Sequence, residues 1–207
     1  MNNKLKGIIF FTKKIKDNDL FIKILSSKDE INSGIVYGGI SSKKKLIYQK
    51  GYFLEYTVTK KNENSPPILL GEISKPYIIN IFNDKYKINA LLSILSLINL
   101  SLLEGQNIKG FFDDIQNLIN KMIQNKHWIL FYCEWLFNLL KRIGYQVDYD
   151  TNTSNKYYDI SLQLFTNNKN MNTIEFPHKF FLKKQEVNFK NISAIFLIFE
   201  SILTKNH

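Results

Sequence analysis

Short clusters of lysine are the residues of this sequence best suited to binding chemistry. Three consecutive lysines follow a pair of glycines and a pair of serines, Gly38-Gly39 and Ser41-Ser42. A flexible, glycine-rich lead lets backbone and ammonium groups approach a phosphate closely. Two further clusters follow apolar runs, in segments expected to connect strands. The eight candidate phosphate-binding residues are Lys13, Lys14, Lys16, Lys43, Lys44, Lys45, Lys60 and Lys61. The alternative is that these runs are solvated faces that only keep the protein soluble.

The charge of the chain is uneven and favours the first interpretation. The 207 residues carry a formal net charge of +10, and the sequence pI is about 9.4. Residues 1–80 hold 14 lysines against 7 acidic residues. Such an excess points to polyanionic partners such as nucleic acid, an anionic membrane surface or acidic protein tails. A membrane-surface role ranks last, because we find no basic amphipathic helix in the pattern.

Aromatic residues interleave with the lysines and could stack on bases that reach them. Most of them are expected to fill the barrel, which has few other large residues. Tyr48 and Phe53 lie off the inward-facing pattern, so they are the candidates for base stacking.

Enzymatic and metal-dependent functions find little support in the sequence. The single cysteine, Cys133, excludes a disulfide framework and a cysteine zinc site within the chain. The three histidines lack ligand spacing, and no phosphate-binding loop of the nucleotide-hydrolase type is present. A two-metal nuclease needs convergent carboxylates, which nothing in the sequence predicts. We therefore expect neither a catalytic residue, a metal nor a cofactor.

The elements that must position the lysines change character near residue 80. Before it, five short apolar or alternating runs predict strands over residues 5–13, 20–25, 31–37, 52–59 and 67–74. In the fourth run, Tyr52, Leu54, Tyr56 and Val58 share one face. Five strands in so short a segment predict a closed or nearly closed barrel of the OB type over residues 1–80.

After residue 80 the apolar period is helical. Helices are expected over residues 88–102, 111–123, 128–143 and 193–203, with a small β-hairpin at about 157–176 that turns at residues 167–170. The fold class is therefore α+β, with an OB-fold domain at 1–80 and a helical domain at 81–207. The longest apolar run, residues 88–103, is interrupted by polar residues and is read as a buried helix rather than a membrane span. No targeting signal is recognised, so a cytoplasmic protein is expected.

In its order of motifs, the chain resembles RecO, a family of bacterial DNA-repair and recombination mediators. The likeness is carried by Lys6-Gly7-Ile8-Ile9, by Ile35-Val36-Tyr37-Gly38-Gly39 with the lysines that follow, by Gln49-Lys50-Gly51, and by Glu134 through Gly144-Tyr145. The closing segment, residues 193–200, also resembles the final helix of the family. Each motif is weak alone, and their order and spacing carry the resemblance.

The resemblance implies an N-terminal OB-fold and a C-terminal helical domain that together serve DNA repair and recombination. It implies binding to single- and double-stranded DNA, to RecR and to the C-terminal tail of single-stranded DNA-binding protein. It also implies annealing of complementary strands and recombinase loading. The protein is then expected in the bacterial cytoplasm, associated with the nucleoid. Many members carry a four-cysteine zinc site, but residues 148–155 contain no cysteine, so zinc is not expected here.

The helix at 128–143 ends in Lys141-Arg142, which could form the basic rim of a cleft for that acidic tail. Cations at a helix C-terminus also have a sufficient structural reason, since they complement the helix dipole. Two other functions remain open beside a non-enzymatic DNA mediator. One is a general RNA- or single-strand-binding OB protein, and the other is a scaffold that binds an acidic protein through the same lysines.

Overall fold

A computed structural model describes residues 4–16, 18–75, 77–185 and 187–206. The chain divides into two compact units, Met1–Ile123 and Gln124–His207, and each is described by itself. The change from strands to helices falls near residue 80, as the hydrophobic period predicts. The first two helices nevertheless belong to the same compact unit as the strands. The division into domains at residue 80 stays a prediction.

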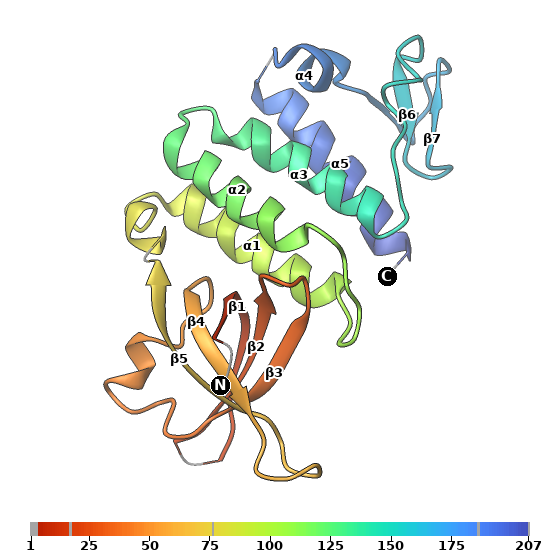
Figure 1. The fold of residues 1–207 in the computed structure, drawn as a ribbon. Helices are drawn as coiled ribbons and strands as arrows, with labels where there is room; N and C mark the ends of the chain where they lie inside the picture. Colours follow the sequence, from red (N-terminus) through yellow and green to blue (C-terminus); the bar gives the residue numbers. More distant parts are fainter. Residues whose placement is uncertain (1–3, 17, 76, 186, 207) are drawn as a thin grey trace. The chain divides into compact units, whose positions relative to one another are not determined.

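Five strands form the closed barrel that the sequence predicts (Figure 1). They are β1 (Leu5–Lys14), β2 (Leu20–Ser26), β3 (Ile31–Val36), β4 (Phe53–Thr59) and β5 (Ile68–Lys75). Their order around the barrel is β1-β2-β3-β5-β4, and β4 pairs back to β1. All pairs are antiparallel except β3 with β5, which closes the barrel through the parallel pair Ile35 and Ile68. This arrangement confirms the α+β class with an N-terminal five-stranded barrel.

The barrel interior is filled by apolar side chains at alternate positions of the strands. Ile9, Ile24, Leu54 and Leu69 are fully buried in it. β1 also passes close to β2 at Gly7, where a Cβ atom would lie 2.4 Å from Ile24 Cγ2. Tight packing of this kind fixes the strands, so the loops between them start from defined positions.

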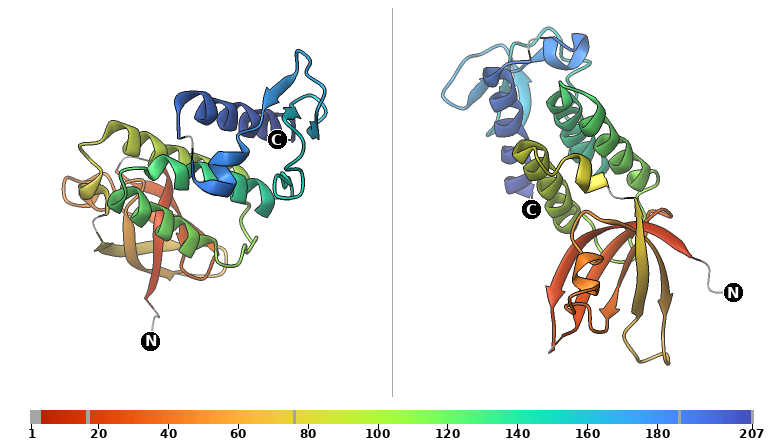
Figure 2. Two further views of the ribbon diagram at one scale, coloured as in Figure 1. Left: turned by 90° about the horizontal axis from the view of Figure 1, so that it is seen from above. Right: turned by 90° about the vertical axis from the view of Figure 1, so that its left-hand side faces the viewer.

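Two helices complete the first unit and lie across one end of the barrel (Figures 1 and 2). They are α1 (Lys85–Ser101) and α2 (Phe111–Gln124), and Asp84 caps α1 by accepting hydrogen bonds from the amides of Tyr86 and Lys87. The turn between β2 and β3 caps α2 in turn. Asp29 Oδ2 accepts from Gly110 N at 2.6 Å, and Asp29 Oδ1 accepts from Phe112 N at 2.8 Å. The barrel therefore supplies two hydrogen-bond acceptors to the start of α2.

The second unit combines helices with a small sheet. Its helices are α3 (Trp128–Arg142), α4 (His178–Lys183) and α5 (Phe189–Asn206), and α3 packs against α5. The predicted hairpin is a three-stranded sheet made of β6 (Tyr157–Asp159), β7 (Leu164–Thr166) and β8 (Thr173–Glu175), with β6 in the centre. Helix α4 has no counterpart among the predicted elements. No helix in the described part of the chain is long and apolar enough to cross a membrane.

An aromatic cluster joins the small sheet to the helices of the second unit. Phe137 of α3 lies 4.8 Å from Phe181 of α4, measured between ring centroids, and Tyr149 stacks on Phe181 at 4.7 Å. Phe176, which directly follows β8, contacts all three rings. Aromatic pairs of this kind add to the burial of apolar area, so this cluster anchors the sheet.

Candidate nucleic-acid interface

Two of the three lysine-bearing loops are joined by hydrogen bonds. Lys13 and Lys14 end β1, Lys16 lies in the β1–β2 loop that follows, and the long β3–β4 connection carries Lys43 to Lys45. Gly38 N donates to Asp19 Oδ1 at 2.8 Å, and Ile40 N donates to Asn18 O at 3.0 Å. Gly38 has a φ of +63°, a conformation that favours glycine and turns the chain out of β3. These bonds hold the first two lysine clusters beside each other.

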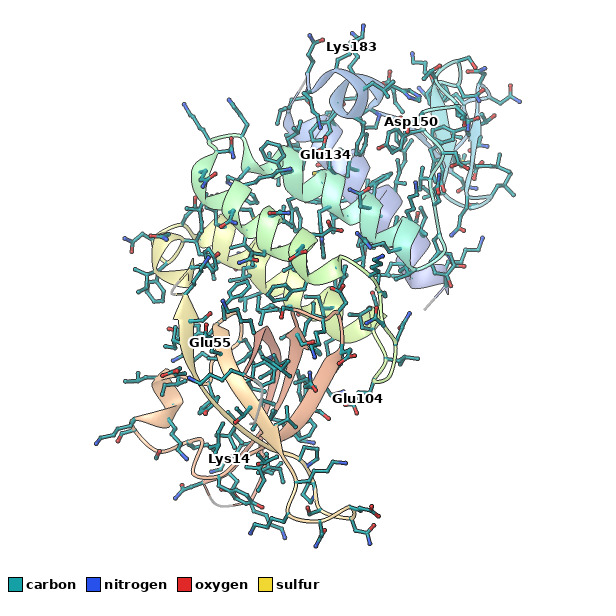
Figure 3. The ribbon with its side chains drawn as sticks, viewed as in Figure 1. Lys14, Glu55, Glu104, Glu134, Asp150 and Lys183 are labelled. Carbon is teal, nitrogen blue, oxygen red and sulfur yellow. The ribbon has the colours of Figure 1, made fainter. Side chains whose placement is uncertain are left out.

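Tyr37 brings the third loop to the same place. Lys44 Nζ donates to Tyr37 O at 2.6 Å, and Lys61 Nζ of the β4–β5 loop lies 5.9 Å from the centre of the Tyr37 ring. The Tyr37 side chain is 45% exposed, so its ring is available to a ligand. Figure 3 shows Lys14 at the end of the barrel remote from α1 and α2. The three lysine-bearing loops thus meet around one exposed aromatic ring.

The eight candidate lysines, called the loop lysines below, differ in how their charge is balanced from three lysines on the wall of the barrel, called the wall lysines. Lys4, Lys6 and Lys23 are ion-paired with Glu72, Glu55 and Glu104 at 2.9, 3.5 and 3.2 Å. None of the eight candidate lysines is ion-paired with an acidic residue that the structure describes. Seven of the eight are exposed and Lys44 is half-buried. No described carboxylate therefore balances the positive charge of the eight candidate lysines, and this charge can attract phosphates.

The Gly-Gly segment is more ordered than the sequence suggests. A short 3-10 helix, Lys44–Leu46, follows it. A Cβ atom at Gly39 would lie 2.7 Å from Leu20 Cβ, so this glycine permits close packing rather than free movement. Lys43, directly before this helix, and Lys45, within it, are both exposed to solvent.

The two residues predicted to stack on bases are buried. The expectation that their rings reach the surface is therefore wrong. Tyr48 is only 5% exposed and belongs to the barrel core, where its hydroxyl accepts from Gly71 N and donates to Gly71 O. Burial raises the pKa of the Tyr48 hydroxyl. Phe53 is 3% exposed and is covered by the rings of Tyr77 and Phe112 at 4.8 and 6.0 Å. Neither ring offers a face to a base in this conformation.

Other aromatic residues are better placed than Tyr48 and Phe53. Besides Tyr37, the half-buried rings of Phe11 and Phe21 meet edge to face at 6.4 Å on neighbouring strands, and Lys50 Nζ lies 5.8 Å from the Phe11 ring. The signal for Tyr37 was its position directly before the Gly-Gly turn, where a strand ends and side chains leave the core.

The second unit holds an apolar cleft with a basic rim, but not at the predicted place. A cavity of about 430 Å³ is lined by Leu130, Phe131 and Val187, with Lys126, His127 and Lys184 around it. Lys141 and Arg142 do not line this cavity. They lie near the other end of α3, roughly 16 Å along the axis from Leu130 at 1.5 Å per residue. Whether Lys141 and Arg142 bind an acidic tail stays a prediction.

The described residues do not assemble a set of metal ligands. No group of three or more His, Cys, Asp and Glu side chains within the described ranges could hold a metal ion. Cys133 is buried in α3, and this burial raises the pKa of its thiol to about 12. A thiol with so high a pKa remains protonated at neutral pH and is a poor nucleophile.

Comparison with known proteins confirms the resemblance seen in the sequence. No protein-family model matches the chain. The chain is 29% identical over 148 residues to the DNA repair protein RecO of Rickettsia canadensis (strain McKiel). This alignment covers 72% of this chain and 61% of that protein. It is 28% identical over 148 residues to RecO of Rickettsia akari (strain Hartford), covering 72% and 62%. The alignment with RecO of Rickettsia bellii (strain OSU 85-389) is 28% identical and covers 72% and 61%. The chain thus spans about three fifths of the length of these curated relatives.

Proposed function

This chain is a relative of the DNA repair protein RecO, and from this premise we propose that it is a non-enzymatic DNA-binding mediator of repair and recombination. In this proposal it binds single- and double-stranded DNA without sequence preference, anneals complementary strands and helps to load recombinase on single-stranded DNA. The observation that carries the proposal is the meeting of three lysine-bearing loops around the exposed ring of Tyr37. Acting on the chromosome would place the protein at the nucleoid in the bacterial cytoplasm.

The physical basis of the proposed binding is the uncompensated charge of the loop lysines. When ammonium groups neutralise phosphates, condensed counterions are released from the DNA, and this release drives association regardless of sequence. Lysine supplies a point charge rather than a planar fork, so it neutralises a phosphate without selecting a base. Two strands neutralised on one protein repel each other less. Annealing can therefore proceed without nucleotide hydrolysis.

The proposed protein partners are RecR and the C-terminal tail of single-stranded DNA-binding protein. The cleft at Leu130, Phe131 and Val187 supports the second partner, because an apolar floor with Lys126 at its rim suits an acidic peptide with an apolar side chain. The other lysine at this cleft, Lys184, is ion-paired with Glu134. Capture of that tail would raise the local concentration of the protein on coated single strands.

The test of the proposed DNA interface is the salt dependence of single-strand binding. Each phosphate contact contributes about 0.7 to the slope of log affinity against log salt concentration. Replacing Lys43, Lys44 and Lys45 together by Gln is expected to make the slope shallower by up to about 2 and to weaken all sequences alike. The matched control replaces the ion-paired Lys4, Lys6 and Lys23 by Gln, which removes the same charge from the barrel wall. Equal slopes in the loop variant and the unchanged protein would remove this loop from the interface.

Two further measurements separate the alternatives. Competition between RNA and DNA oligonucleotides of the same sequence distinguishes a DNA mediator from a general RNA-binding OB protein. Annealing of complementary oligonucleotides coated with single-stranded DNA-binding protein distinguishes a mediator from a scaffold for an acidic protein, which would show no annealing.

A further inference from the structure

The outer face of β1 and β2 displays two aromatic rings. Thr12 of β1 is paired with Ile22 of β2, and Ile22 is fully buried in the barrel core. Successive side chains point to opposite faces of a strand, so Phe11 and Phe21 lie on the outer face of the barrel. Both rings are half-buried, and they meet edge to face. Part of each ring therefore remains open to a ligand on the barrel wall.

The register of the strands places these two rings in a diagonal row that leads to Tyr37. Phe21 pairs with Lys13 of β1, which lies two residues after Phe11. On its other side, Phe21 pairs with Ile35 of β3, which lies two residues before Tyr37. Diagonal neighbours on one face of antiparallel strands are within reach of each other's aromatic side chains. The row Phe11, Phe21, Tyr37 thus crosses three neighbouring strands and ends at the lysine-bearing loops (Figure 1).

Lysines accompany the row at the end that faces the loops. Lys13 lies on the same outer face as the two rings, and Lys50 Nζ lies 5.8 Å from the centre of the Phe11 ring. Further along β2, the same face carries Lys23, whose Nζ lies 3.2 Å from Glu104 Oε1. A phosphate beside the rings can be met by the ammonium groups of Lys13 and Lys50, whereas the carboxylate of Glu104 would repel it. The charges therefore favour a strand that approaches from the loops.

The mutual geometry of the two rings suits unpaired bases. The ring centroids of Phe11 and Phe21 lie 6.4 Å apart, and the ring planes are inclined by 71°. Neighbouring bases of a duplex are parallel and only about 3.4 Å apart along each strand. Bases that lie flat against both rings are farther apart and steeply inclined to each other. Only a strand whose bases are neither paired nor stacked on one another can meet both rings.

We propose that Phe11 and Phe21, together with Tyr37, form a stacking platform through which the barrel prefers single-stranded to double-stranded DNA. The proposal rests on the proposed DNA-binding function and adds the form of DNA that this face takes. The loop lysines attract the phosphates of either form, and the platform adds binding free energy only for unpaired bases. A duplex made by annealing would lose these contacts, so the protein would leave its product and return to single strands.

The test compares single-stranded and duplex oligonucleotides of one sequence by fluorescence anisotropy. The platform variant, Phe11→Leu with Phe21→Leu, removes both rings but retains apolar side chains of similar size. Stacking of one base is worth roughly 5- to 150-fold in affinity, so single-strand binding should weaken at least about tenfold. Duplex affinity should stay within about twofold and the salt slope should not change, because no charge is removed.

Two further variants serve as controls. Phe82→Leu with Tyr86→Leu removes two rings that are 69% and 68% exposed near the start of α1, away from the platform. This variant should bind both forms of DNA like the unchanged protein. Phe11→Tyr with Phe21→Tyr retains both rings and should keep the preference for single strands.

Photo-crosslinking of the unchanged protein provides a second measurement that needs no variant to fold. A single strand with 5-bromouracil in place of thymine crosslinks to aromatic side chains that contact its bases. Trypsin cleaves after lysine, so the two rings fall in separate peptides, residues 7–13 and 17–23. Crosslinks in these peptides are expected with the single strand and not with the duplex. Their absence with the single strand would overturn the proposal.

The outcomes separate this proposal from the proposed function. Equal weakening of single-strand and duplex binding in the platform variant would mean that the rings only support the loops, and would overturn the inference. Unchanged single-strand binding in the platform variant, with a shallower salt slope in the Lys43, Lys44 and Lys45 variant, would leave the proposed function standing and remove the platform. Selective loss of single-strand binding in the platform variant, with an unchanged slope in the loop variant, would support the platform and refute the proposed loop interface.

Discussion

Replacing Tyr37 by alanine should weaken single-strand binding without changing its salt dependence. The ring is 45% exposed and lies among three lysine-bearing loops, with Lys61 Nζ at 5.9 Å from its centre. Stacking of one base on an exposed aromatic ring is worth about 1–3 kcal/mol, which corresponds to a loss of affinity of roughly 5- to 150-fold. No charge is removed, so the number of released counterions should stay the same.

The measurement is fluorescence anisotropy of a labelled oligonucleotide at several salt concentrations. Tyr37→Phe retains the ring and should bind like the unchanged protein. Tyr86 offers a matched control, because it is 68% exposed and Lys85 Nζ lies 5.4 Å from its ring, but it is on α1 and away from the loops. Tyr86→Ala should leave the affinity unchanged.

An oligonucleotide with abasic sites provides the internal check. If Tyr37 stacks on a base, Tyr37→Ala and the unchanged protein should bind the abasic strand with similar affinity. Equal affinity of Tyr37→Ala and the unchanged protein for the normal strand would refute base stacking at Tyr37. A shallower salt slope in Tyr37→Ala would show instead that the ring acts by positioning Lys44 and Lys61.

Three predictions concern stability, two in the first unit, which carries these loops, and one in the second unit. Asp29→Gly keeps the positive φ of that residue but removes the carboxylate that caps α2, so urea unfolding should show a loss of about 1–2 kcal/mol. Gly7→Ala would place a Cβ atom 2.4 Å from Ile24 Cγ2 and 2.6 Å from Leu25 O, and should cost about 1–3 kcal/mol in the same assay. Hydrogen bonds from Leu162 N, Asn170 and Ser161 N lower the pKa of Asp159, so its contribution is present above about pH 4 and is lost as the pH falls through the lowered value. In Asp159→Asn, the free energy of unfolding should therefore fall less steeply as the pH is lowered below about 4. An unchanged dependence on pH in this range would contradict a stabilising role of the ionised Asp159.

The strands and long helices could be predicted because their hydrophobic periods are intrinsic to the segments. The alternation of residues 52–59 locates β4 within one residue, and the helical spacing of residues 111–123 locates α2 equally well. Helix α4 spans only six residues after Pro177, which is too few for a helical period to be recognised. The strands of the small sheet have three residues each, so their pairing depends on turns such as Asn170 to Thr173 rather than on a pattern.

The candidate site was predictable in its charges but not in its aromatic residues. Alternation separates the two faces of a strand, and Phe53 does point away from the barrel interior; nothing in the pattern says that Tyr77 and Phe112 cover it. Tyr48 lies in an irregular segment without any period, so its burial depends on the tertiary path of the β3–β4 connection. The convergence of the lysine loops on Tyr37 also depends on long-range hydrogen bonds, which the local sequence cannot specify.

The composition of the loops has a consequence for how DNA would be read. Arginine makes the bidentate contacts to guanine that most often give base specificity, and the only arginine in the chain is Arg142 in α3. The loops therefore present ammonium groups and a tyrosine ring, which recognise phosphate and the faces of bases but not their edges. The wall lysines already lie beside carboxylates, so their charge contributes little to an approaching strand. In the proposed interface, the ion pairing of each lysine would therefore decide where DNA binds, and the net charge alone would not locate the site.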